Sequence, residues 1–129
     1  MIVDASAVLA ILFGEPERMA FRAAISKAEQ PTISPVNYLE VCLRIDRGTM
    51  PELSENLDPL MNTLGLIIAT LGEEQAHLAR EAYQRFGKGN HPAKLNLGDC
   101  FAYALAKTRS EPLLYKGGDF TLTDVEAAL

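Results

Sequence analysis

Short hydrophobic runs alternate along this chain with longer stretches in which apolar residues recur every three or four positions. The short runs predict buried strands and the longer stretches predict amphipathic helices. Strands are expected at residues 1–5, 32–33, 66–70 and 112–115. Helices are expected at residues 6–30 with a break at 13–16, and at 34–48, 51–64, 73–86 and 98–109. Because strands and helices alternate, we expect an α/β fold with a central parallel sheet covered by helices on both faces.

Local signals support several of these elements. Ser34 and Pro35 form a typical helix start, with serine as the cap and proline in the first turn. The predicted helix over 98–109 is apolar nearly all round, so we expect it to be central and buried. The polar, glycine-rich residues 87–97 predict a loop. The tail from Phe120 onward predicts either a weak edge strand or a frayed end.

The composition of the chain excludes several classes of protein. The 129 residues fit one domain, and 48% hydrophobic residues can form a core without disulfides or metal. A formal net charge of −5 excludes nucleic-acid binding by bulk positive charge alone. Cys42 and Cys100 lack the spacing of a zinc site or a disulfide framework. The sequence shows no membrane span and no secretory start, so we expect a cytoplasmic protein.

Four acids occupy positions where an acid is costly or well placed. Asp4 ends the first predicted strand, where it has no evident local role, and Asp119 follows the last one. Glu40 and Asp99 lie near the starts of helices. The carboxyl ends of parallel strands and the starts of the following helices meet at one edge of the sheet, where ligands bind. We therefore expect the four acids to share one cleft.

Such a cleft would need a counter-charge. Carboxylates held close together repel one another, and burial adds to the cost. Oxygen ligands suit Mg²⁺ or Mn²⁺, and nitrogen and sulfur ligands are scarce here. Two such ions could activate a water molecule and stabilise both oxygens of an in-line phosphodiester displacement.

Three of the acids also have local alternatives. Asp99 fits the first turn of a helix capped by Asn96. Asp119 follows two glycines and fits a turn. Glu40 has Arg44 four residues later, which fits an ion pair along a helix.

The residues around the four acids resemble sequence motifs of a known family, the PIN-domain toxins of the VapC type. Residues 1–7, with the sequence MIVDASA, are similar to the family's opening, and residues 34–41 to its second acidic motif. Residues 97–106, LGDCFAYALA, are similar to its third motif, and residues 115–120, YKGGDF, to its fourth. The four motifs occur in the family's order and span essentially the whole chain.

The resemblance implies a single PIN domain over residues 1–129, folded as a three-layer α/β/α sandwich. It implies a Mg²⁺- or Mn²⁺-dependent endoribonuclease, with Asp4, Glu40, Asp99 and Asp119 as metal-binding catalytic acids. Ser6 matches a hydroxyl that supports the first acid and metal-bound waters, although capping the first helix is an equal alternative. The protein would be the toxin of a toxin–antitoxin pair and a homodimer. Its partners would be RNA and a VapB-type antitoxin that points a basic side chain at the acids.

The chain departs from the family pattern after the last strand. Gly118 stands where many relatives carry a polar residue, and the tail after Asp119 is short. Asp124 could help or replace Asp119, or it could be a plain surface residue.

Other residues have both a functional and a structural interpretation. The residues expected to meet RNA phosphates, or else to lie in solvated loops, are Lys88, His91, Lys94 and Lys116. Tyr38 and Tyr103 could stack on bases or pack between helices.

Two other enzyme classes fit less well. Phosphatases of the haloacid dehalogenase type typically carry a second Asp where this chain has Ser6. Receiver domains normally begin with paired acids, whereas Asp4 stands alone. The non-enzymatic alternative is a catalytically silent PIN-like module that binds RNA or protein.

Overall fold

Four short strands form one parallel sheet at the centre of the computed structural model, which describes residues 1–129. The strands are β1 (Ile2–Val3), β2 (Thr32–Ile33), β3 (Ile67–Ile68) and β4 (Leu113–Leu114). Their order is β3-β2-β1-β4, and every neighbouring pair is parallel. In β1, Ile2 lies opposite Thr32 on one side and Leu113 on the other. Each strand falls within its predicted range, which confirms the parallel sheet.

Six helices connect and cover the strands. They are α1 (Ala5–Leu12), α2 (Arg18–Lys27), α3 (Pro35–Asp46), α4 (Pro51–Leu64), α5 (Glu73–Phe86) and α6 (Leu97–Arg109). Ser34 caps α3 through its side chain, which accepts from the Val36 amide at 3.3 Å, as its sequence predicts. The α6 helix is buried along most of its length, which confirms its central position. No helix is both long and apolar enough to cross a membrane.

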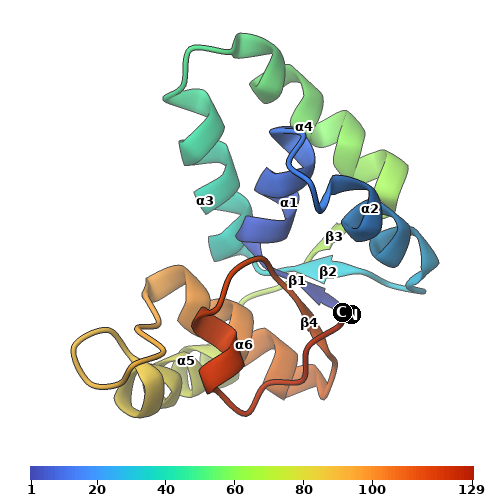
Figure 1. Ribbon diagram of the computed structural model, residues 1–129. Coiled ribbons are helices and arrows are strands. Elements are labelled where there is room, and N and C mark those ends of the chain that lie inside the picture. The colour runs from blue at the N-terminus through green and yellow to red at the C-terminus, as the bar shows by residue number, and fades with distance from the viewer.

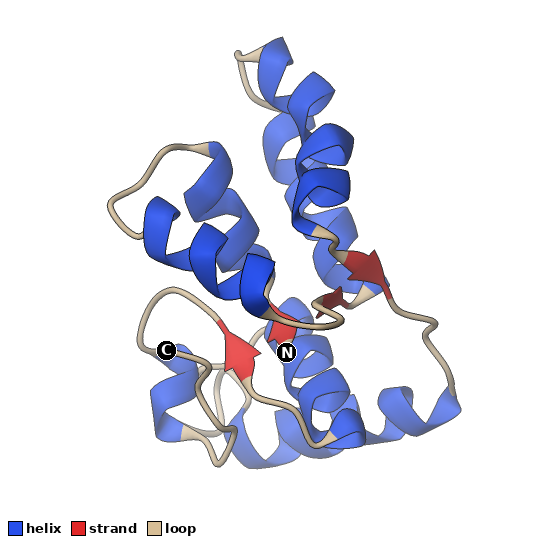
Figure 2. Cartoon of the chain, turned by 90° about the vertical axis from the view of Figure 1, so that its right-hand side faces the viewer, coloured by secondary structure: helices blue, strands red, loops and turns tan.

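The two faces of the sheet are covered by different helices, and the strand pleat separates their cores. Val3 packs into a hydrophobic cluster built with α1 to α4, whereas Ile2 packs into a second cluster built with α5 and α6. Figure 1 shows α1 to α4 above the sheet and α5 and α6 below it. Figure 2 shows the same two groups of helices on either side of the strands. The predicted three-layer α/β/α sandwich is therefore confirmed.

The strand order fixes the place where a ligand site is expected. From β1 the chain adds β2 and β3 on one side, and then returns to add β4 on the other side of β1. In open α/β sheets, ligands bind beyond the carboxyl ends of the strands at the point where the order reverses. Here the carboxyl end of β1 is that point, and Asp4 is the next residue.

The C-terminal tail forms an edge contact and is not frayed. A short 3-10 helix, η1 (Asp119–Leu122), follows β4. The chain then lies beside β4, where the Leu113 amide donates to the Glu126 carbonyl at 2.8 Å and the Ala128 amide donates to the Leu113 carbonyl at 2.9 Å. The tail therefore pairs with the sheet edge through an isolated bridge between Leu113 and Ala127, which is closer to the predicted edge strand than to a frayed end.

Candidate active site

Three of the four predicted acids line one cleft at the carboxyl end of β1. Asp4, Glu40 and Asp99 border a hollow of about 390 Å³, together with Ser6 and Asn96. These acids come from the end of β1, from α3 and from the first turn of α6. The fold thus brings together carboxylates that lie far apart in the sequence.

Asp4 is the most deeply buried of the three, with 4% of its surface exposed. It caps α1, because its Oδ2 atom accepts from the Ser6 amide at 2.9 Å and from the Ser6 hydroxyl at 2.6 Å. The Ser6 hydroxyl accepts in turn from the Lys116 amide, at 2.9 Å, just after β4. Ser6 therefore supports the carboxylate of Asp4 and connects it to the residues after β4. The alternative role predicted for Ser6, capping α1, belongs to Asp4 instead.

Asn37 connects the acids and was not identified from the sequence. Its Nδ2 atom lies 2.9 Å from Glu40 Oε2, 3.4 Å from Asp4 Oδ1 and 3.0 Å from the Gly98 carbonyl oxygen. The side chain is fully buried, and its Oδ1 atom has no hydrogen-bond partner. A buried amide between two carboxylates partly offsets their negative charge by donating to both.

Gly98 makes room for the Glu40 carboxylate. A Cβ atom built on Gly98 would lie 2.1 Å from Glu40 Oε1 and 2.2 Å from Oε2. No side chain fits there without displacing the carboxylate. The backbone of Gly98 has no positive φ angle, so its conformation does not require glycine. The glycine is needed because a side chain would collide with the Glu40 carboxylate.

Asp99 serves both its helix and the cleft. Its Oδ2 atom accepts from the Asn96 amide at 3.1 Å, while its own amide donates to Asn96 Oδ1 at 2.9 Å. This reciprocal capping box confirms the local alternative predicted for Asp99. The same residue nevertheless borders the cleft, so capping fixes the carboxylate at the site entrance.

The cleft holds its acids in an environment that opposes ionisation. Burial raises the pKa of Asp4, and the charge of Asp119 adds to the effect. Burial also raises the pKa of Glu40, with a further contribution from Asp4. For Asp99, burial and then the charges of the other three acids raise the pKa to about 7. Carboxylates that cannot all ionise at low cost form a site that favours a positive ligand.

Asp119 is close enough to influence these acids but does not border the cleft. It begins η1 and is exposed, and its charge acts on both Asp4 and Asp99. Its assignment as a fourth ligand stays a prediction. The alternative ion pair between Glu40 and Arg44 does not form, and the Arg44 guanidinium lies over the Phe13 ring at 4.9 Å from its centroid.

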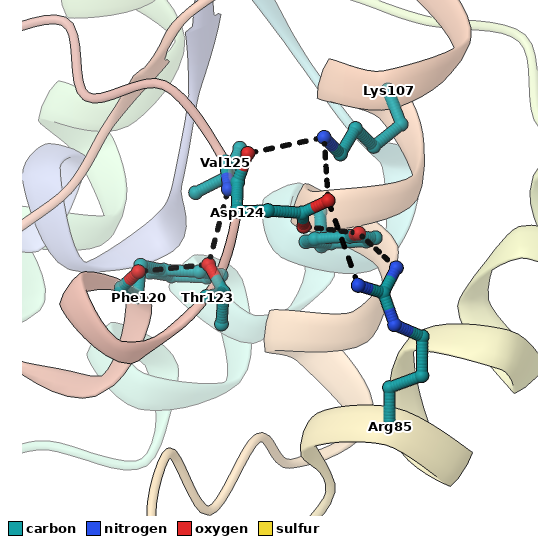
Figure 3. Close-up of polar contacts among 7 residues, drawn as sticks. Arg85, Lys107, Phe120, Thr123, Asp124 and Val125 are labelled. Carbon is teal, nitrogen blue, oxygen red and sulfur yellow. Dashed lines mark hydrogen bonds and ion pairs between the residues drawn. The ribbon is translucent and has the colours of Figure 1, made fainter.

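Asp124 belongs to a separate ionic network, which Figure 3 shows. Its carboxylate accepts from the Tyr103 hydroxyl at 2.6 Å and lies 3.1 Å from Lys107 Nζ and 3.6 Å from an Arg85 nitrogen. Partial burial opposes ionisation, but the hydrogen bonds and positive charges around it lower the pKa of Asp124 overall. This network fastens the tail to α5 and α6 and favours a structural role for both Asp124 and Tyr103.

The basic residues near the acids differ from those expected. Lys116 pairs with Glu15 and, at 3.1 Å, with Glu17, so its charge is already neutralised. The ring of His91 accepts from the Ala93 amide at 3.1 Å and packs against Phe86, and therefore has a structural role. The two cations that do line the cleft are Arg44 and Arg47.

The donor set of the cleft suits a hard divalent cation. All of its candidate ligands are carboxylate oxygens, and the unpartnered Asn37 Oδ1 is a further oxygen buried beside them. In the present arrangement, no group of three or more His, Cys, Asp or Glu side chains is gathered tightly enough to hold an ion. The residues fit such an ion by their chemistry and by their shared cleft.

The chain resembles known proteins over nearly its whole length. The family model described as the PIN domain matches residues 1–126. Ribonuclease VapC28 of Mycobacterium tuberculosis is 45% identical over 130 residues, covering 100% of this chain and 98% of that protein. Ribonuclease VapC42 of the same species is 41% identical, covering 99% of this chain and 98% of the relative. Ribonuclease VapC of Mycolicibacterium smegmatis is also 41% identical, covering 98% of both.

A solved structure shows the same fold. The crystal structure of VapC20 from M. tuberculosis, a toxin that cleaves the sarcin–ricin loop, aligns with a TM-score of 0.76. The alignment covers 96% of this chain and 95% of VapC20, at 13% sequence identity. On the strength of the family model and the close relatives, this chain belongs to the PIN-domain family, among the VapC ribonucleases.

Proposed function

We propose that this protein is a Mg²⁺- or Mn²⁺-dependent endoribonuclease and the toxin of a VapBC-type toxin–antitoxin pair. The observation that carries the proposal is the cleft shared by Asp4, Glu40 and Asp99, in which burial and the charges of neighbouring acids raise all three pKa values. Relatives that are 41–45% identical to this chain are named ribonucleases. RNA is therefore the substrate class that the cleft is proposed to bind.

In this proposal each residue of the cleft has a defined task. Asp4, Glu40, Asp99 and Asp119 hold the divalent cation, which when bound supplies an activated water and stabilises charge on the phosphodiester oxygens. Ser6 fixes one oxygen of Asp4 through its hydroxyl. Asn37 holds the other Asp4 oxygen and one oxygen of Glu40 at a fixed separation.

The negative charge of the cleft also bears on the partner that we propose. Without a metal, the negative charge of the four carboxylates would be partly offset by a basic side chain, which a VapB-type antitoxin is proposed to insert into the cleft. We also propose a single domain over residues 1–129 and a homodimer. Copurification with the product of the neighbouring gene, followed by mass measurement of the complex, tests these partners.

The proposed activity is tested with purified protein and labelled RNA. We expect Mg²⁺ or Mn²⁺ to support cleavage that leaves a 5′-phosphate, and EDTA to stop it. Sequencing the 5′-phosphate ends that accumulate after brief induction, beside an Asp99→Asn control, would identify the target. Cleavage that persists in EDTA would contradict the proposal, and RNA binding without any cleavage would favour a silent binding module.

Replacing Gly98 by Ala should weaken metal binding while the fold is retained. The three atoms nearest to the new Cβ atom would all belong to the flexible end of Glu40, which can rotate away and so leave the cleft. Because Glu40 is displaced but not removed, Mn²⁺ affinity and the cleavage rate should fall by about 10–100-fold, as when a group that positions a ligand is lost. Calorimetric titration with Mn²⁺ and a cleavage assay measure both quantities.

The matched control is Gly72→Ala. Gly72 precedes α5, and a Cβ atom there meets nothing within 4 Å. This variant should bind Mn²⁺ and cut RNA like the wild type. Equal Mn²⁺ affinity in the Gly98→Ala and Gly72→Ala proteins would show that Glu40 does not need the space at Gly98.

A further inference from the structure

Two arginines border the acidic cleft on the side of α3. Arg44 and Arg47 follow Glu40 by four and seven residues, so all three lie on one side of the helix. Both arginines line the same hollow as Asp4, Glu40 and Asp99. At 1.5 Å per residue, they stand about 6 Å and about 10 Å along the helix axis from Glu40.

Neither arginine is neutralised by an acid. The six ion pairs of the structure involve other groups, and the carboxylate between the two arginines, Asp46, accepts from the Ser54 hydroxyl on α4 at 2.7 Å. The Arg44 guanidinium lies over the Phe13 ring, which holds it by a cation–π contact without consuming its hydrogen-bond donors. Two exposed, unpaired guanidinium groups therefore stand beside three carboxylates.

A helix-dipole effect accounts for only part of this arrangement. Cations are favoured at the end of a helix, and both arginines lie in or just after the last turn of α3. That effect is satisfied by any basic residue on any side of the turn. It does not explain why both side chains border the cleft that contains the acids.

Phosphate chemistry explains the location. A guanidinium group donates two parallel hydrogen bonds to phosphate oxygens, and it remains charged at any physiological pH. A polyanion that enters a cleft lined by carboxylates needs a positive contact for the part of its backbone that is not at the metal. Lys116, the other cation near the acids, is already paired with Glu15 and Glu17 and is not free to supply that contact.

We propose that Arg44 and Arg47 form a phosphate-binding subsite that holds the RNA backbone next to the bond being cut, along α3. This inference rests on the proposed function and adds the direction in which the RNA strand leaves the acids. The two arginines position the substrate and take no part in the chemical step.

The test is steady-state cleavage of a short, fluorescent single-stranded RNA by an Arg44→Gln/Arg47→Gln variant. We expect KM to rise on the order of tenfold, kcat to change less than about twofold, and Mn²⁺ affinity to stay the same. Each lost phosphate contact on a single strand lowers the salt dependence by about 0.7, so the log–log slope of kcat/KM against salt should become shallower by about 1.4. Arg44→Lys/Arg47→Lys should restore most of this slope, because the charges return.

The matched control is Arg80→Gln, which removes an exposed arginine from α5, outside the cleft. It should keep the wild-type KM and slope. An Arg44→Gln/Arg47→Gln variant with wild-type KM and slope would overturn the subsite, as would a loss of kcat and Mn²⁺ affinity with KM unchanged. If the wild-type protein does not cut the RNA, the proposed function fails. Fluorescence anisotropy with the same RNA then decides the subsite separately, since equal affinity of wild type and variant contradicts it.

Discussion

Replacing Asp4 by Asn should abolish RNA cleavage without unfolding the protein. Asp4 is the most buried acid of the cleft, and both of its oxygens are engaged, one by Ser6 and the other by Asn37. Changes to groups that merely support a metal ligand cost about 10–100-fold, so loss of a ligand should cost more than about 100-fold in cleavage rate. Cleavage of labelled RNA under saturating Mg²⁺ measures the loss.

The stability of the same variant separates a chemical defect from a folding defect. Asn is as good a helix cap as Asp, so α1 should keep its start. Because burial and neighbouring charge raise the pKa of Asp4, its ionised form destabilises the metal-free protein at neutral pH. The Asp4→Asn melting temperature without metal should therefore equal or exceed that of the wild type.

An exposed acid provides the control for this experiment. Asp58 lies on α4, accepts a hydrogen bond from the Tyr38 hydroxyl at 3.1 Å, and is not among the residues that line the cleft. Asp58→Asn makes the same chemical change and should leave cleavage unaltered. Full activity in the Asp4→Asn protein would refute the assignment of the catalytic cleft.

The elements with long periodic patterns were the ones that the sequence predicted best. The α4 and α5 helices begin and end where the spacing of their apolar residues predicts, because each buries a single stripe and needs no distant partner to define it. The strands are only two residues long, and their pairing depends on contacts between distant segments. The alternation of strands and helices was enough to predict the layers, since few topologies satisfy it.

The sequence predicted those site residues whose positions are determined by chain topology. Asp4, Glu40 and Asp99 follow strand ends or begin helices, and topology alone brings such positions to one edge of the sheet. The position of Asp119 depends on the η1 turn, whose geometry is set by tertiary contacts of the tail. The pattern of the sequence therefore could not show that Asp119 stays outside the lining of the cleft.

The missed residues have contacts that are remote in sequence. Asn37 donates to the Gly98 carbonyl, 61 residues away, and its only sequence signal is a polar residue in register with the buried Val41 and Ile45 of α3. For Lys116 the sequence left open a phosphate contact or a solvated loop, and in the fold Glu15, from the turn after α1, pairs with it. Partners across the chain decide which polar groups remain free for a ligand, and local spacing does not reveal them.

Adding Mg²⁺ or Mn²⁺ should raise the melting temperature strongly at about pH 8 and only slightly at about pH 5. The pKa of Asp99 is raised from 3.8 to about 7, and burial shifts the pKa values of Asp4 and Glu40 in the same direction. The folded protein thus binds these protons more tightly than the unfolded chain does. Without metal, the free energy of unfolding should fall as the pH rises from about 4 to about 7.

A bound cation reverses this loss, because it interacts with the ionised acids alone and competes with the protons. At a metal concentration 100 times the dissociation constant, binding adds about 2.7 kcal/mol, or roughly 10 °C in melting temperature for a domain of this size. Thermal unfolding at both pH values, with and without metal, measures the difference. The Asp4→Asn protein should show a much smaller shift, whereas Asp58→Asn should behave as the wild type. A shift of equal size at both pH values would mean that the cation binds outside the cleft, since only groups that titrate in this interval can make its binding depend on pH.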